Sequence, residues 1–88
     1  MRLDKFLKIS RLIKRRTLAK EVADQGRITI NGNQAKAASN VNVGDELTIQ
    51  FGQKLLTIQI ESLRETVKKD EAASLYKVKN EEEVNASR

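Results

Sequence analysis

The sequence predicts an α+β fold in which two N-terminal helices pack on a small, mostly antiparallel sheet. Apolar residues recur at helical spacing in the first part of the chain, and after Gly26 they alternate with polar residues, as in half-buried strands. Turn signals at Asn31-Gly32, at Gly44-Asp45 and at residues 52–54 separate the alternating segments. With 88 residues, the chain has room for one domain with a modest core.

The first helix is predicted over Leu3–Ile9, because its apolar and charged residues fall on two faces. The second is expected to run from residue 15 or 16 to residue 25, before Gly26, a typical left-handed C-cap residue. Leu12 and Ile13 are expected to anchor the link between the two helices on the core. The stripe that the second helix is expected to bury contains Leu18, Ala19, Val22 and Ala23.

Three strands are predicted, at residues 27–32, 46–51 and 55–60, where apolar residues occupy alternate positions. Residues 33–41 lack this periodicity and are expected to form a connector. Phe6 and Phe51 both fit core positions. The residues expected to face the core from the strands are Ile28, Ile30, Leu47, Ile49, Phe51, Leu56, Ile58 and Ile60.

Residues 1–61 are therefore expected to form the folded domain, and residues 62–88 a C-terminal extension that is partly helical or disordered. Strand character ends at about Glu61, whereas residues 70–78 could form a short helix that packs back on the domain. Residues 79–88 are polar, charged and terminal, and they are expected to be frayed or disordered.

The composition excludes several classes of active site. The chain has no His and no Cys, so it has no thiolate nucleophile, no nucleophile–histidine pair and none of the usual zinc ligand sets. A glycine-rich phosphate loop is also missing. We therefore expect no enzyme, no catalytic residue, no metal and no cofactor. No apolar run approaches the roughly 20 residues that span a bilayer, so a cytoplasmic protein without a membrane partner is expected.

Positive charge is concentrated in the first two fifths of the chain. Residues 1–36 contain ten Lys or Arg against three acids, a balance of +7, and residues 37–88 contain seven against nine, a balance of −2. Such asymmetry favours a polyanionic partner, most often a nucleic acid.

Four of these cations surround the start of the second helix, where they oppose the helix dipole: Arg11, Lys14, Arg15 and Arg16. The arrangement becomes favourable once a phosphate binds, because the helix N–H groups and the guanidinium groups then point at the same anion. Asp4 is expected to orient Lys8 or Arg16 by an ion pair. Thr17 is a candidate cap of the helix, unless Arg15 and Arg16 already lie in its first turn.

A structured RNA, bound through its shape and backbone, fits this pattern better than DNA or a splayed single strand. Aromatic residues are too few for a stacking platform. The exposed face of the second helix offers Lys20, Glu21, Asp24 and Gln25, whose acids would repel the phosphates beside a DNA groove.

The sequence resembles the S4 RNA-binding domain, whose motifs it carries in order over residues 2–60. The matching motifs are R-L-D-K-F-L at 2–7, S-R at 10–11, K-x-R-T-x-A at 14–19, Gly26, I-N-G at 30–32, Lys36 and V-x-x-G-D at 41–45. The resemblance implies the S4 (alpha-L) fold. Arg15 departs from the small or hydroxylated residue expected before Arg16, and it adds to the positive charge. Carried over by position, the implied RNA contacts are Arg2, Lys8, Arg11, Lys14, Arg15, Arg16 and Lys20.

Within this family, the sequence is most similar to the free-standing members, the heat-shock protein 15 and RqcP branch, with an RqcP-like protein preferred. That resemblance implies binding to the rRNA of the large ribosomal subunit and to the peptidyl-tRNA that it carries. It also implies a role in ribosome-associated quality control, in which an RqcH-type factor adds alanine tails to stalled chains. Nothing in the pattern argues against a monomer.

Two other functions remain open from the residues. One is a stand-alone RNA chaperone or ribosome assembly factor. The other is a protein–protein adaptor that acts through the C-terminal extension, around Leu75 and Tyr76. Charge reversal at Arg16 separates the RNA-binding functions from the adaptor.

Overall fold

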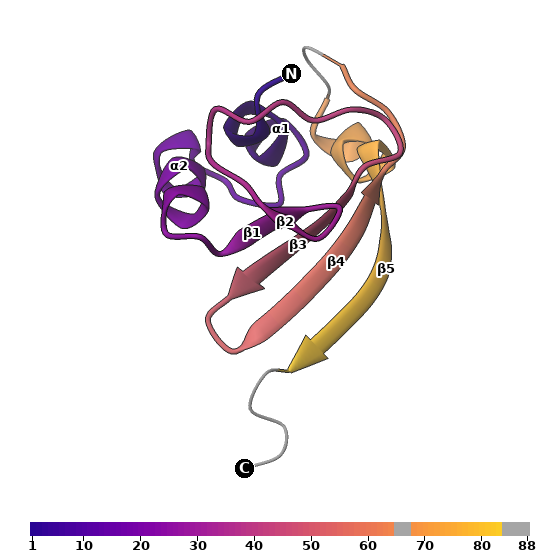
Figure 1. Cartoon of the computed structure of the whole chain (residues 1–88). Helices are drawn as coiled ribbons and strands as arrows, with labels where there is room; N and C mark the ends of the chain where they lie inside the picture. Colours follow the sequence, from indigo (N-terminus) through magenta and orange to yellow (C-terminus); the bar gives the residue numbers. More distant parts are fainter. Residues whose placement is uncertain (65–67, 84–88) are drawn as a thin grey trace.

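In the computed structural model, which describes residues 1–64 and 68–83, two short helices lie beside one end of a five-stranded antiparallel sheet (Figure 1). Helix α1 spans Leu3–Ile9 and helix α2 spans Arg16–Asp24, and the two pack against each other. The strand order is β2-β1-β3-β4-β5. The strands are β1 (Ile28–Ile30), β2 (Asn33–Gln34), β3 (Glu46–Phe51), β4 (Lys54–Ile60) and β5 (Tyr76–Glu83).

Helix α1 has the predicted bounds because its apolar face is buried completely. Leu3, Phe6 and Leu7 have no exposed surface and lie at the centre of the core. The helix ends at Ser10, whose buried hydroxyl donates to the carbonyl of Leu7 at 3.2 Å. Burying three large apolar side chains stabilises this seven-residue helix, which would not form in isolation.

Helix α2 ends as predicted, in a Schellman motif at Gly26. The Gly26 N–H donates to Ala23 at 3.0 Å, the Arg27 N–H donates to Val22 at 3.2 Å, and Gly26 has φ +80°. The predicted buried stripe is wrong at one position, because Leu18 is 48% exposed. Neither α1 nor the sheet covers the side of the first turn on which Leu18 lies. The buried stripe therefore begins at Ala19.

The sheet confirms the predicted alternation and adds a strand. Leu47, Ile49 and Ile58 are completely buried, whereas Phe51 and Leu56, nearer the hairpin at residues 52–53, are only partly covered. In the expected connector, residues 33–34 form β2 and pair with β1 across a two-residue turn. Both turn residues, at positions 31 and 32, have positive φ, as a tight hairpin requires.

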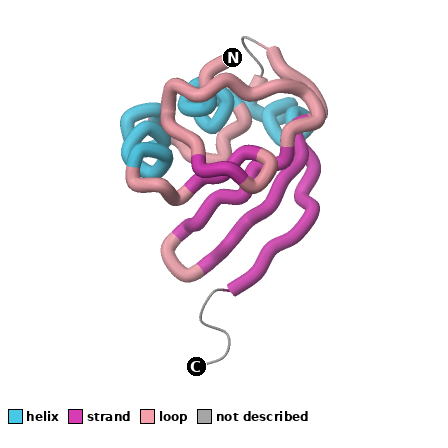
Figure 2. The backbone as a smooth tube through the Cα atoms, viewed as in Figure 1, coloured by secondary structure: helices cyan, strands magenta, loops and turns pink. Residues whose placement is uncertain are grey.

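The expectation that strands end at residue 61 is wrong, because β5 follows the 3₁₀ helix η1 (Lys69–Leu75) and pairs with β4 (Figure 2). Its register with β4 runs from Ile60↔Tyr76 to Lys54↔Glu83. The expected packing of the extension is confirmed by Ala72 and Leu75, which are buried. The short helix expected at residues 70–78 is the 3₁₀ helix η1 and ends at Leu75, and residues 79–83, expected to be frayed, belong to β5. The rest of the expected frayed end, residues 84–88, lies outside the described residues.

The segment between β2 and β3 fixes the N-terminus of the chain. The Leu3 and Asp4 N–H groups donate to the carbonyls of Ser39 and Ala37, at 2.7 and 3.2 Å, and Arg2 forms an isolated β-bridge with Asn40. The Ala37 N–H also donates to Asp24 Oδ1, at the end of α2, at 3.3 Å, so this segment connects the start of α1 to α2. Across residues 1–64 and 68–83, no helix has the length and apolar character needed to span a membrane.

Candidate nucleic-acid interface

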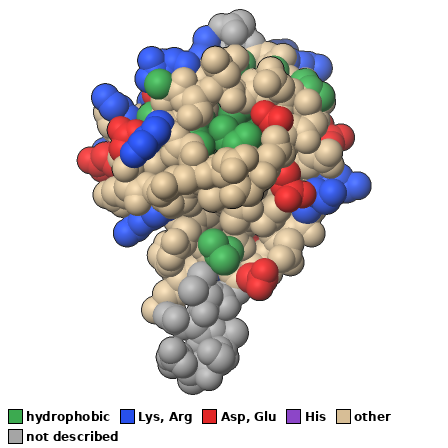
Figure 3. Space-filling model, in the orientation of Figure 1, with side chains coloured by type: hydrophobic (Ala, Val, Ile, Leu, Met, Phe, Trp, Pro, Cys, Tyr) green, Lys and Arg blue, Asp and Glu red, His purple; other side chains and the backbone are tan. Residues whose placement is uncertain are grey.

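The seven cations predicted to contact RNA are all exposed and come from one end of the molecule: the residue before α1, the end of α1, the link and α2. Blue side chains gather at the upper left of Figure 3, over the helices of Figure 1. We call this set the cationic surface; it consists of Arg2, Lys8, Arg11, Lys14, Arg15, Arg16 and Lys20.

Asp4 connects two members of the cationic surface that are far apart in the sequence. Its side chain is only 3% exposed, and its Oδ1 and Oδ2 accept from Arg2 Nε and Nη2, both at 3.2 Å. Arg16 Nε lies 3.4 Å from Oδ2, and Arg16 Nη2 lies 3.5 Å from Oδ1. The predicted pair with Arg16 is confirmed, and the second partner is Arg2 rather than the proposed Lys8. The carboxylate therefore draws the start of α1 and the start of α2 together.

The carboxylate remains ionised in this position. Burial alone would raise the pKa of Asp4, but hydrogen bonds from Arg2 and Arg16, together with their positive charges, outweigh burial and lower it below the ordinary value of 3.8. Each guanidinium group is about half exposed and has five N–H donors, of which Asp4 uses at most two. The buried Asp4 thus orients Arg2 and Arg16, and both guanidinium groups keep donors free for an anion on the solvent side.

The N-terminus of α2 has no side-chain cap. Arg15 occupies the N-cap position, with extended φ and ψ of −114° and 132°, and its side chain makes no cap hydrogen bond. Thr17 is the second residue of the helix, so the prediction that it caps α2 is wrong. The alternative, with Arg15 and Arg16 in the first turn, holds for Arg16 but not for Arg15, which is the N-cap residue. The first four N–H groups of a helix, counted from the N-cap, have no intrahelical acceptor. Here they belong to residues 15–18, at the centre of the cationic surface.

Arg11 has an unusual backbone conformation, with φ +64° in the region that glycine prefers. Its N–H donates to the Lys8 carbonyl at 3.1 Å, immediately after the end of α1. The next anchor of the link is Ile13, which is buried and donates its N–H to the Leu7 carbonyl at 3.1 Å. Arg11 is therefore an exposed cation at a sharp turn of an otherwise anchored link.

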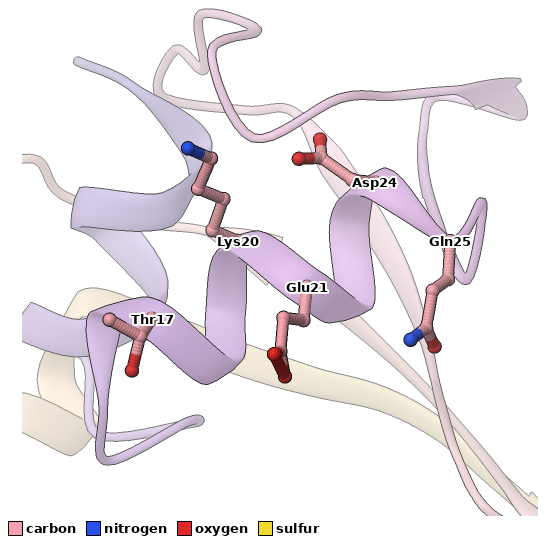
Figure 4. A pocket seen from close by; sticks show the side chains of 5 residues that line it. All are labelled: Thr17, Lys20, Glu21, Asp24 and Gln25. Carbon is pink, nitrogen blue, oxygen red and sulfur yellow. The ribbon is translucent and has the colours of Figure 1, made fainter.

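Lys20 lies at the edge of the cationic surface, on a helix face that also carries acids. Thr17, Lys20, Glu21, Asp24 and Gln25 line an open pocket on α2 (Figure 4). In this view Lys20 points toward α1, whereas Glu21 and Gln25 point to the other side of the helix. The two acids make the pocket a poor phosphate site. Across residues 1–64 and 68–83, no three His, Cys, Asp or Glu side chains converge to hold a metal ion.

Two of the sequence motifs have a structural role that the sequence did not indicate. Asn31 of the I-N-G motif contacts Asp45 of the V-x-x-G-D motif, with Nδ2 donating to Oδ1 at 3.1 Å. The Asn31 Oδ1 atom also accepts from the Glu46 N–H at 2.9 Å. These bonds fix the β1–β2 hairpin to the start of β3, at some distance in the sequence from the cations. Lys36, another motif residue, has an exposed side chain, and its backbone N–H donates to Ser39 Oγ at 3.0 Å.

Comparison with known proteins now identifies the family. Residues 1–47 match the S4 domain, over the part of the chain that contains the whole cationic surface. An RQC P-site tRNA stabilizing factor of Bacillus subtilis is 70% identical over 96% of this chain and 98% of its own length. The chain belongs to the S4-domain family, in the branch of the RQC P-site tRNA stabilizing factors.

A second factor of this name and a solved structure support the assignment. The factor of the same name from Halalkalibacterium halodurans is 67% identical over 99% of both chains. Among solved structures, heat shock protein 15 of Vibrio cholerae, described as trimeric, has a TM-score of 0.83 and 34% identity, over 90% of this chain and 81% of that one. The S4 fold predicted from the motifs is therefore confirmed.

Proposed function

We propose that the protein binds the large ribosomal subunit that carries a peptidyl-tRNA, and stabilises that tRNA during ribosome-associated quality control. The observation that carries the proposal is the uncapped N-terminus of α2, surrounded by cations of which two are oriented by the buried Asp4. The names of relatives at 70% and 67% identity support the choice of ligand.

The geometry suits recognition of a phosphate backbone. A phosphate at the start of α2 would accept from helix N–H groups and from guanidinium donors at the same time. Because the cationic surface spans two helices and their link, it can contact several phosphates of a folded RNA. Such contacts fix position and orientation and carry little sequence information. The protein would act as a clamp between rRNA and tRNA.

The finer features of the proposal come from the resemblance of the sequence motifs to the family. The protein would be a cytoplasmic, monomeric binding factor without catalytic activity or a cofactor. By keeping the tRNA in a productive site, it would help an RqcH-type factor to elongate C-terminal alanine tails on stalled chains. The RNA contacts would all come from residues 1–61, because the seven cations lie there.

The test is co-sedimentation with large subunits purified from stalled cells, with Arg16→Glu compared with the unmodified protein over a salt series. If four to six phosphates are neutralised, the log–log slope of affinity against salt should be roughly −3 to −5. Arg16→Glu should abolish binding while its circular dichroism spectrum stays unchanged. Arg64→Glu, a charge reversal at another exposed arginine in the extension, is the matched control and should bind normally.

Vacant large subunits provide the second comparison. Binding that requires peptidyl-tRNA supports the proposed function, whereas equal binding to vacant subunits would favour an assembly factor or RNA chaperone. Binding that survives Arg16→Glu with little salt dependence would contradict the phosphate clamp and favour an adaptor that uses the extension.

A further inference from the structure

Leu18 is a large apolar side chain that the fold leaves exposed beside the cationic surface. It is 48% exposed, although it lies in a helix whose neighbouring Ala19 has no exposed surface. The Val22 side chain, one turn further along α2, packs against the core. Leu18 therefore extends the apolar stripe of α2 beyond the core, toward the N-terminus of the helix.

The direction of helical side chains places Leu18 over that N-terminus. Side chains in an α-helix tilt toward its N-terminus, so a residue covers the surface of the turn before its own Cα. For Leu18 this turn begins at Arg15, the N-cap residue of α2. The backbone N–H of Leu18 is one of the four that lack an intrahelical acceptor. An anion bound at these N–H groups would thus have the Leu18 side chain next to it.

We propose that Leu18 makes an apolar contact with a ribose or nucleobase of the RNA strand whose phosphates the cationic surface binds. This inference rests on the proposed function and adds a second kind of contact to it. The charge around Leu18 favours RNA over a protein as the occupant, because Lys14, Arg15 and Arg16 lie two to four positions before it in the sequence. In RNA, each phosphate joins two riboses that have apolar C–H surface, and each ribose carries a base with an apolar face.

An apolar contact and a phosphate contact respond differently to salt. Phosphate contacts release counterions, so losing one makes the log–log salt slope shallower by about 0.7–0.9. An apolar contact releases no counterions, so its loss lowers the affinity by the same factor at every salt concentration and leaves the log–log slope unchanged. The salt dependence can therefore separate the role of Leu18 from that of its cationic neighbours.

The experiment measures the affinity of labelled protein for large subunits that carry peptidyl-tRNA, at several salt concentrations. Leu18→Ala should weaken binding about fivefold at every salt concentration, the effect expected when a half-exposed leucine becomes covered. Leu18→Met, which keeps the volume, should bind as the unmodified protein does. Arg15→Ala should make the salt slope shallower by about one phosphate contact.

Val78→Ala is the matched control, because Val78 is 52% exposed and lies on β5, away from the helices. Thermal melts followed by circular dichroism check that each variant folds. If Leu18→Ala binds like the unmodified protein while Arg16→Glu does not bind, the apolar contact is refuted and the proposed function stands. If Leu18→Ala leaves subunit binding intact but lowers recruitment of the tailing factor, the contact is with a protein and the inference is also refuted.

Discussion

Asp4 is the residue on which the geometry of the cationic surface depends most. Its buried carboxylate pairs with Arg2 and Arg16, which lie 14 positions apart in the sequence and are each about half exposed. Ion pairs at an exposed site contribute little to stability. When a buried acid loses its charge, in contrast, the charges of its partners are left uncompensated. Asp4 should therefore influence both stability and RNA binding.

We expect Asp4→Asn to lower the free energy of unfolding at pH 7 by about 1–2 kcal/mol, in urea titrations. The native pKa of Asp4 lies below its ordinary value of 3.8, so the folded chain binds fewer protons and gains stability above that pH. This gain is lost as the pH falls through the native pKa. The difference in free energy of unfolding between the unmodified protein and Asp4→Asn should then shrink. Glu21→Gln, at an exposed acid of α2, is the control; a constant difference down to low pH would contradict the assignment.

Arg11 offers a separate prediction, because its backbone and its side chain should have opposite effects. A non-glycine residue in the left-handed region costs roughly 1–2 kcal/mol, and glycine relieves that cost with a smaller entropic penalty. We expect Arg11→Gly to raise the free energy of unfolding by about 0.5–1 kcal/mol and to weaken subunit binding. Lys14→Gly, at another exposed cation of the link whose φ is not positive, should weaken binding without that gain. If Arg11→Gly lowers stability, the strain argument fails.

At the scale of elements, the sequence predicted the helices and strands that have one buried face, because burial at regular spacing leaves a periodic pattern of apolar residues. The bounds of α1 and the inward residues of β3 and β4 follow from one face turned to the core. Leu18 could not be predicted, because periodicity does not reveal how wide a surface covers a helix. Strand β5 was missed because it lies at the sheet edge and its residues 77–82 are all exposed, so no alternation of apolar and polar residues marks it. In the candidate site, composition identified the cations, but only the fold shows that Asp4 joins Arg2 to Arg16.

The free edge of β5 carries features that oppose pairing with another chain. In its register with β4, Val78 faces Ile58 and Asn80 faces Thr57, so Lys79 is an extra residue in a bulge. Bulges and lysines are common protections of edge strands. Lys77 is a second exposed cation on the same strand. These features support the proposed monomer.

We expect Lys77→Val combined with Lys79→Val to cause concentration-dependent association through this edge. Sedimentation velocity over a range of protein concentrations would measure it. The control is Lys20→Val combined with Lys36→Val, which also removes two exposed cations but leaves β5 unchanged. If both double variants remain monomeric, the lysines do not protect the edge; if both associate, lost net charge rather than strand pairing is the cause.

At the scale of the whole molecule, the proposed RNA contacts lie in the first part of the chain, whereas folding stability depends on both parts. The cationic surface lies in the first 20 residues, within the domain expected to end at residue 61. The core, however, also includes Leu75, which is 1% exposed, and β5 covers the edge of β4 along its length. The Glu61 and Ser62 N–H groups both donate to the Leu75 carbonyl, at 2.8 and 3.2 Å, which ties the end of β4 to η1.

Truncation after residue 61 should therefore remove structure that the first 61 residues need. It would expose the edge of β4 and uncover Ile58 and Ile60, which are buried in the full chain. In a small domain, the total free energy of unfolding is about 5–15 kcal/mol. The free energy lost with one strand of the sheet and a buried leucine is comparable with that total. We expect the truncated chain to lose its cooperative urea transition and the dispersion of its amide proton signals, whereas truncation after residue 83 should preserve both. A truncated chain of 61 residues that unfolds cooperatively and still binds large subunits would show instead that the extension is dispensable for folding and for RNA recognition.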